Sequence, residues 1–246
     1  MRRYIDLGID SRNMLPEDLK SMINIACSMN FSALGVKLDF KTKEQDLKLL
    51  KQLSREYGID LAARIDLAPR SRTRLLRDLR ESQKTFEVTA VHTKSGGLAK
   101  TAIRDDRVDL ISISSKDSGA AFSPSIARLV ASTGKAVEFE LSSLILSKGQ
   151  ERIDLLSWMR RCAKLAKIFH VNVVISSGAA DKYLLRSPMD QASIAHLIGM
   201  NLPTALDSLS NIPQSILERN RARLDPRQIS SGVRIKEGKD DACSPR

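Results

Sequence analysis

Acidic residues recur at the ends of short apolar runs in this chain, where they could hold a metal ion. They are Asp6, Asp39, Asp66, Glu138 and Glu140. Carboxylate oxygens are suitable magnesium ligands, whereas a histidine-based metal hydrolase needs several histidines on one rim. Of the three histidines, only His92 falls at the end of an apolar run. Three interpretations follow: a carboxylate metal site, ion pairs between these acids and barrel arginines such as Arg64, or simple exposure to solvent.

The small-residue segment 176–179, Ser-Ser-Gly-Ala, is a second candidate site. Backbone N–H groups and hydroxyl side chains in such a loop can bind phosphate. An ordinary turn between a strand and a helix would have the same composition, so both interpretations stay open. Cys27 and Cys162 fall at inward positions of helical patterns, and nothing resembles a nucleophile elbow. The sequence therefore predicts no catalytic residue.

Basic residues outnumber acidic ones by 40 to 29, which gives a formal net charge of +11. Such a balance predicts an anionic partner, with nucleic acid first. Arginine forms forked hydrogen bonds with phosphate. Aromatic residues make up 4% of the chain, so recognition of RNA backbone and shape is favoured over base stacking. The basic residues expected to contact RNA include Arg64, Arg70, Arg74, Arg77, Arg104 and Lys116.

The elements that would position these residues alternate between strand and helix patterns. Strands are expected at 4–10, 33–39, 60–67, 86–92, 108–114, 136–141 and 172–177, with a weak eighth near 199–202. Nearly continuous apolar runs such as 171–175 are typical of strands buried on both faces of a parallel sheet. At least seven such units with short loops favour a closed (β/α) barrel of the TIM type over an open sheet.

The composition changes after Leu224. Residues 225–246 are rich in Pro, Gly, Ser and charge, so the chain is expected to hold one barrel domain, 1–224, and a loose charged tail, 225–246. Three distant cysteines predict a reducing compartment. The N-terminus lacks the apolar region of a signal peptide, and no run approaches the roughly 18 apolar residues of a membrane span. These features predict a cytoplasmic protein without a membrane partner.

The segment from the seventh expected strand onward carries a family resemblance. It contains Val-Val-Ile-Ser-Ser-Gly-Ala (173–179), Leu-Arg-Ser-Pro-Met-Asp (185–190), His-Leu-Ile-Gly-Met (196–200) and Pro-Gln-Ser-Ile-Leu-Glu-Arg-Asn-Arg (213–221). The start, Tyr-Ile-Asp-Leu-Gly-Ile-Asp (4–10), and Gly-Val-Lys (35–37) belong to the same pattern. Residues 1–224 thus resemble the archaeal ribonuclease P protein component 3 family, which has eukaryotic relatives among RNase P and MRP subunits.

The resemblance implies a barrel related to the polymerase-and-histidinol-phosphatase hydrolases whose metal site is lost. Where those hydrolases have His-x-His after the first strand, this chain has Asp6-Leu7-Gly8. The resemblance adds Arg186 and Lys37 to the expected RNA contacts and supports Arg77 and Lys116. Lys37, at the end of the second expected strand, has the alternative of pairing with a barrel acid. Asp190 lies three residues after Ser187, a spacing that equally predicts a helix capping box.

The resemblance further implies a protein subunit of ribonuclease P, which removes 5′ leaders from precursor tRNA. Catalysis would reside in the RNA subunit, which would use Mg²⁺, and this chain would bind no cofactor. A second small protein subunit would bind alongside it on the ribonuclease P RNA. About six phosphate contacts would give a log–log salt slope near −5. Two alternatives remain: a metal-dependent phosphoester hydrolase with a carboxylate-rich site, and a scaffold that binds only the partner protein.

Overall fold

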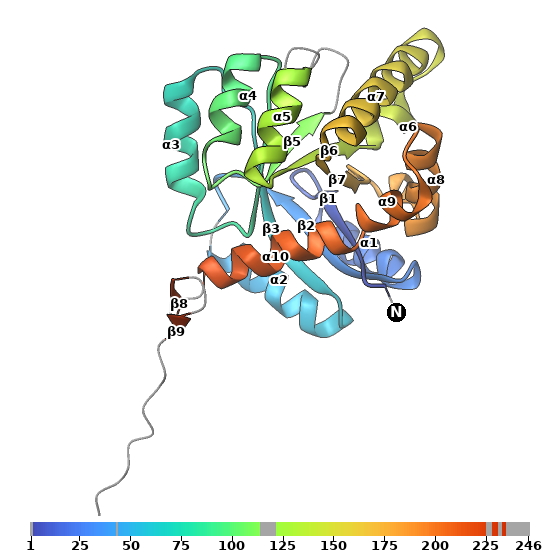
Figure 1. Ribbon diagram of the computed structural model, residues 1–246. Helices are drawn as coiled ribbons and strands as arrows, with labels where there is room; N and C mark the ends of the chain where they lie inside the picture. The colour runs from blue at the N-terminus through green and yellow to red at the C-terminus, as the bar shows by residue number, and fades with distance from the viewer. Residues whose placement is uncertain (1, 43, 114–121, 225–227, 231–232, 235–246) are drawn as a thin grey trace, which may run out of the picture.

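The computed structural model describes residues 2–42, 44–113, 122–224, 228–230 and 233–234. Seven parallel strands form one sheet in which each strand pairs with the next along the chain. The sheet curves into a nearly closed barrel with helices outside it (Figure 1), which confirms the expected TIM-like fold. The strands are β1 (Tyr4–Asp10), β2 (Phe31–Leu38), β3 (Asp60–Leu67), β4 (Val88–His92), β5 (Leu110–Ile113), β6 (Ala136–Glu140) and β7 (Asn172–Ser176).

Helices connect successive strands and bury their apolar face against the sheet. Leu75 and Leu79 are fully buried on one face of the third helix, while Arg74 and Arg77 on its other face are exposed. The helices are α1 (Pro16–Ser28), α2 (Glu44–Tyr57), α3 (Arg72–Ser82), α4 (Gly96–Ile103), α5 (Pro124–Thr133), α6 (Ser142–Leu146), α7 (Gly149–Phe169), the 3₁₀ helix η2 (Lys182–Leu184), α8 (Pro188–Leu197), α9 (Leu202–Asp207) and α10 (Asn211–Leu224).

The barrel interior is apolar toward the start of the strands. Side chains two residues apart on a strand point to the same side, so each strand contributes to successive interior layers. The apolar layers contain Ile5, Leu7, Ala33, Ala62, Val88, Ala90, Leu110, Ala136 and Val174. Helix α10 lies across this end, where Ile216 and Leu217 pack onto the same cluster. Burial of this apolar surface closes the barrel at the N-terminal ends of its strands.

Helix α10 is also tied to this end of the barrel by charge. Arg221 pairs with Asp60 at 2.6 Å and with Glu87 at 2.5 Å, and Arg219 pairs with the buried Asp109 at 2.8 Å. Arg219 and Arg221 thus bind acids at the beginnings of β3, β4 and β5, and Arg223 donates to the carbonyl of Asp106 at 2.7 Å.

The prediction of an eighth strand near 199–202 is wrong. These described residues form the turn between α8 and α9, because Asn201 caps α9 and Pro203 occupies its first turn. Strands β1 and β7 form no ladder with each other among the described residues. The gap is bridged instead by two backbone carbonyls: the N–H of Ile175 donates to Ser208 at 3.2 Å, and the N–H of Ile5 donates to Leu209 at 2.8 Å.

Glycine allows β1 to approach the end of β7 closely. A Cβ on Gly8 would lie 2.6 Å from the Cβ of Ser176, closer than two carbon atoms can pack. Beyond this point the N–H of Asp10 donates to the carbonyl of Ala179 at 2.8 Å. The barrel is therefore closed at its C-terminal end by this direct approach, without an additional strand.

Helix α8 begins with the predicted capping box. The hydroxyl of Ser187 accepts from the N–H of Asp190 at 3.2 Å, and the Asp190 carboxylate accepts from the N–H of Ser187 at 3.3 Å. Pro188 follows at the first helical position. The structural role expected of Ser187 and Asp190 is confirmed.

The segment beyond Leu224 is described only in part. Gln228–Ser230 (β8) and Val233–Arg234 (β9) form a two-stranded antiparallel sheet, and the rest of the proposed tail lies outside the described residues. Within the described part of the chain, none of the helices combines the length and the apolar character needed to cross a membrane.

Candidate functional site

Charged side chains replace apolar ones inside the barrel at the C-terminal ends of the strands. Arg64 on β3 reaches Glu138 on β6, and Lys37 on β2 reaches Glu140 on β6. These strands are not neighbours in the sheet, so the pairs span the interior. The interior ion network consists of Lys37, Arg64, Asp66, His92, Glu138 and Glu140.

Arg64 is the most buried member of the network. Its side chain is 0% exposed, and its Nη1 and Nη2 atoms donate to the two Glu138 oxygens at 2.5 and 2.7 Å. The Nε atom donates to Asp66 at 2.6 Å, and Nη1 also donates to the carbonyl of Leu7 at 2.8 Å. A planar guanidinium can satisfy two carboxylates and a carbonyl at once, which a lysine ammonium could not do in this geometry.

Lys37 forms the second centre of the network. Its Nζ atom lies 2.7 Å from a Glu140 oxygen and 3.2 Å from Asp66 Oδ2, and its side chain is 2% exposed. His92 Nε2 lies 3.0 Å from the same Asp66 oxygen. The described part of the network carries two permanent cations against three carboxylates, so it is close to electrically balanced.

The pKa values of these acids follow from this balance. Burial disfavours the ionised carboxylate of Glu138, but the Arg64 guanidinium outweighs it and holds the Glu138 pKa at about 2. Burial likewise opposes ionisation of Asp66, yet Arg64, His92 and Lys37 hold its pKa well below the usual range. The same acids raise the pKa of Lys37 despite its desolvation and its proximity to Arg64. All three groups are therefore charged at neutral pH.

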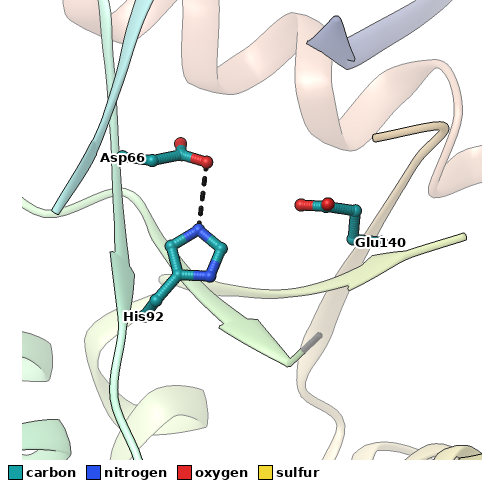
Figure 2. Close-up of side chains that lie close together, drawn as sticks. All are labelled: Asp66, His92 and Glu140. Atoms are coloured by element: carbon teal, nitrogen blue, oxygen red, sulfur yellow. Dashed lines mark hydrogen bonds and ion pairs between the residues drawn. The ribbon is translucent and has the colours of Figure 1, made fainter. Parts of the chain in front are cut away.

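Asp66, His92 and Glu140 form a cluster that could hold a metal ion. One potential ligand atom from each lies within 4.8 Å of the other two. Figure 2 shows the His92 ring and both carboxylates pointing toward one another from β3, β4 and β6. The same carboxylate oxygens already bind Lys37, so the ion-pair interpretation of these acids matches the geometry. The hydrolase alternative is not favoured, because Lys37 and Arg64 occupy the acids it would need.

The 176–179 loop surrounds a carboxylate of the protein itself. Asp6, fully buried on β1, accepts from the N–H groups of Gly8 at 2.9 Å and Ser177 at 3.1 Å, and from Gln191 Nε2 at 3.2 Å. Burial raises the pKa of Asp6, although these hydrogen bonds partly oppose the shift. The N–H of Ala179 is bonded to the Ser177 hydroxyl. Two backbone donors of the expected phosphate loop are therefore already used, which favours the turn interpretation.

The structure corrects two of the expected RNA contacts. Arg64 and Lys37 are 0% and 1% exposed, and their charged groups bind interior carboxylates. The sequence left two interpretations open for both residues, RNA contact or pairing with a barrel acid, because basic residues are rarely buried unless they are paired. The structure decides for the second. Their position inside the barrel follows from strand alternation, which turns residues 37 and 64 inward.

The other expected contacts fall into separate places. Arg70, Arg74, Arg77 and Arg104 are exposed on and beside the adjacent helices α3 and α4. Arg186 is half-buried near α8, and its Nη1 donates to the carbonyls of Tyr183 and Leu185, both at 2.8 Å. Helix α8 is on the opposite side of the molecule from α3 and α4 in Figure 1. Lys116 lies outside the described residues.

The basic helical face comprises the exposed cationic residues of α3, α4 and their flanking loops. Glu81 is an exposed acid on α3, and the Asp78 carboxylate there is buried and paired with Arg74. Cations therefore dominate this surface, which can attract a polyanion. Its basic residues are Arg70, Arg72, Arg74, Arg77, Arg80, Lys84, Lys94, Lys100 and Arg104.

Sequence reasoning missed the residues that hold the interior together. Gln191 was not singled out, yet it binds Asp6, and Ser176 was expected only as part of a phosphate-binding loop, whereas its hydroxyl donates to Glu138 at 2.6 Å. A signal was present for part of the network: Arg64 with Asp66, and Glu138 with Glu140, are charged pairs spaced by two in otherwise apolar strands. That spacing places both members of each pair on one face. Nothing in the sequence marked Gln191 as the partner of Asp6.

The interior network makes stability depend on pH with a predictable sign. The ordinary pKa of a glutamate is 4.5, and Glu138 titrates at about 2 in the folded protein. Its contribution to stability is thus present above about pH 4.5 and is lost as the pH falls toward 2. Glu138→Gln should lower the free energy of unfolding by about 3–5 kcal/mol at neutral pH. This difference from wild type should shrink between pH 5 and 2 in urea titrations followed by circular dichroism.

The control for this experiment is Glu218→Gln, which changes an exposed glutamate on α10. Its unfolding free energy should follow that of the wild type at every pH. A difference between Glu138→Gln and wild type that stays constant from pH 7 to 3 would contradict the assignment of the low pKa to Glu138.

Two curated archaeal proteins are similar to this chain over most of its length. Ribonuclease P protein component 3 from Methanosarcina mazei is 29% identical over 183 residues, which cover 74% of this chain and 76% of the relative. The protein of the same name from Methanococcoides burtonii is 26% identical over 240 residues, which cover 96% of this chain and 95% of the relative.

Two solved structures show the same fold. A chain in the cryo-EM structure of archaeal ribonuclease P with mature tRNA superposes with a TM-score of 0.81 at 19% identity, covering 96% of this chain and all of that one. Histidinol phosphate phosphatase from Lactococcus lactis superposes with a TM-score of 0.51 at 10% identity, covering 89% and 94%. The family model described as RNase P subunit p30 matches residues 3–225. This chain therefore belongs to the RNase P subunit p30 family.

Proposed function

We propose that this chain is a protein subunit of ribonuclease P and takes part in removing 5′ leaders from precursor tRNA. The observation that carries the proposal is the family match over residues 3–225, nearly the whole barrel. The curated relatives bear the name of a ribonuclease P component, and the barrel superposes on a chain of an archaeal ribonuclease P particle. The proposed partners are ribonuclease P RNA, precursor tRNA through the assembled enzyme, and a second small protein subunit.

Catalysis is assigned to the RNA subunit and its Mg²⁺, and this chain is assigned a supporting role. The position where a barrel enzyme carries its reactive groups is the C-terminal end of the strands. In this chain the acids at that position are held by Arg64 and Lys37. An acid bound in this way cannot act as a general base without first breaking a buried ion pair.

RNA is assigned to the basic helical face. Its arginines lie mainly on α3, and the adjacent helix α4 adds Lys100 and is followed by Arg104 at its C-terminal cap. Guanidinium groups can bind phosphates in forked pairs and so lower the repulsion between RNA helices that pack closely. This mechanism would reduce the Mg²⁺ concentration that the active RNA fold requires.

The second protein subunit is assigned to the opposite side of the molecule, where exposed apolar side chains are concentrated. Helices α6 to α9 lie together there, away from α3 and α4 (Figure 1). Exposed apolar side chains in such numbers fit a protein contact better than an RNA contact. They are Leu146, Ile153, Tyr183, Met189, Leu197 and Leu202, which are 46–76% exposed.

The partner assignment predicts that a charge on this side weakens the protein complex. Ile153→Glu places a carboxylate at a 57% exposed apolar position of α7 and should reduce retention of the second subunit in a pull-down. The matched control is Ile168→Glu, which changes a 54% exposed isoleucine that is left out of the proposed contact. It lies at the end of α7 beside α5, 15 residues and thus roughly 22 Å along the helix from Ile153. Equal retention by the wild type and Ile153→Glu would contradict the assignment.

The function itself is tested by cleavage of precursor tRNA at limiting Mg²⁺. The reaction contains the cognate RNA alone, with this chain, with the second protein, or with both. We expect cleavage to increase when both proteins are present, because added cations allow the RNA to fold at lower Mg²⁺. Cleavage by the protein without RNA would overturn the assignment of catalysis to the RNA.

The basic helical face is tested by the salt dependence of RNA affinity. The triple variant Arg70→Ala/Arg77→Ala/Arg104→Ala should reduce the slope of log affinity against log salt by about 1 for each phosphate contact that is lost. The control triple variant, Lys20→Ala/Lys48→Ala/Arg55→Ala, removes the same charge from α1 and α2. It should leave most of the slope intact. Equal losses in both variants would mean that net charge, and not this face, binds RNA.

A further inference from the structure

The ammonium of Lys37 occupies the point where three potential metal ligands converge. It lies 3.2 Å from Asp66 Oδ2 and 2.7 Å from Glu140 Oε2, and His92 Nε2 is bonded to the same Asp66 oxygen. We propose that Lys37 is a built-in cation that fills a divalent-metal site formed by Asp66, His92 and Glu140, and that removal of its side chain opens this site to a transition metal. The inference does not depend on the RNA-related function.

The ligand set suits a transition metal. A neutral imidazole and two carboxylates are a common donor set for zinc and its neighbours. Ligands that bind one ion at about 2.0–2.2 Å lie roughly 3–3.5 Å from each other. Asp66 Oδ2 and His92 Nε2 are already 3.0 Å apart, and all three donor atoms lie within 4.8 Å. A shift of the Glu140 carboxylate, which is 14% exposed, would complete the approach.

The outer partners of the ligands are already in place. Asp66 uses Oδ1 to accept from Arg64 at 2.6 Å, and Glu140 uses Oε1 to accept from Ser142 at 3.1 Å. Each carboxylate thus turns its second oxygen, Oδ2 or Oε2, toward Lys37. Outer hydrogen bonds that fix the orientation of first ligands are a usual feature of metal sites. The arrangement therefore holds two oxygens in position for a cation.

The interior charge also requires a cation at this point. Without Lys37, Arg64 alone would face the carboxylates of Asp66, Glu138 and Glu140, all in a largely buried space. An uncompensated buried charge costs several kcal/mol in typical proteins, so the emptied site would favour any cation that fits. A divalent ion would replace one positive charge with two.

A buried hydroxyl beside the cluster adds a further possible donor. Ser112 on β5 is paired in register with His92 on β4 and Glu138 on β6. Its side chain is buried, and within the described part of the chain its Oγ atom has no hydrogen-bond partner. A polar atom left unpaired in this position is costly unless a ligand or water binds it.

The test is a Co²⁺ titration of the purified full-length chain, because Co²⁺ bound by imidazole and carboxylates absorbs visible light. Lys37→Ala should bind a single Co²⁺ per chain, and bound Co²⁺ should raise its melting temperature. The wild type should show neither effect. Adding His92→Ala to Lys37→Ala should weaken binding by roughly 10–100-fold or more, because even outer partners of a ligand contribute that much.

Lys135→Ala is the matched control. Lys135 is also buried, but its Nζ atom donates to the carbonyls of Asp105 and Val108 rather than to the cluster. Its removal should destabilise the protein without creating a Co²⁺ site. Binding by Lys135→Ala that equals binding by Lys37→Ala would mean that loosened packing, and not the vacated cation position, exposes the ligands.

The remaining outcomes also decide the proposal. Folding of Lys37→Ala only when Co²⁺ is present would support it. A folded Lys37→Ala that binds no Co²⁺ would overturn it. Binding of Co²⁺ by the wild type through His92 would also overturn it, because the Lys37 ammonium would then not exclude a metal ion from the site. If neither Lys37→Ala nor Lys37→Ser folds with or without Co²⁺, a metal cannot replace the ammonium and the proposal is wrong.

Discussion

A guanidinium with no contact to water must be satisfied by the protein, and Arg64 imposes that requirement on the barrel. Its partners come from three places: the carbonyl of Leu7 on β1, Asp66 on its own strand, and Glu138 on β6. Taking these charges out of water is favourable only if every donor is matched. The curvature of the sheet is what brings β1, β3 and β6 within reach of one side chain. The interior charge and the barrel shape therefore depend on each other.

Backbone polar groups of β1 and β7 also need partners, because these two strands do not pair with each other. Two carbonyls of the segment before α10 accept from β1 and β7, and Asp6 accepts from the turn after β7. A complete eighth strand would have paired these backbone groups through a ladder. The chain instead uses the carbonyls of Ser208 and Leu209 in the loop before α10, together with the buried carboxylate of Asp6. The apolar residues of α10 cover the barrel interior at the N-terminal ends of the strands.

In this member of the RNase P subunit p30 family, the charged groups inside the barrel and those on its outer helices have different roles. Inside, cations and carboxylates neutralise one another at the end of the barrel where enzymes of this fold carry their reactive groups. Outside, the basic residues of α3 and α4 remain exposed, and apolar side chains are exposed across α6 to α9. The charge that can act on a partner therefore belongs to the helices and not to the strands.

The sequence by itself determined the barrel, seven of its strands, the cap of α8 by Ser187 and Asp190, and the family. Strand alternation, apolar periodicity and capping are local, so they can be read without distant contacts. The sequence did not determine whether a basic residue lies on the surface or binds an interior carboxylate. Arg64 and Lys37 differ from Arg74 and Arg77 mainly through Glu138 and Glu140, which pair with them from more than 70 positions away. The tertiary structure decided that distinction, because only a closed barrel brings β2 and β3 opposite β6.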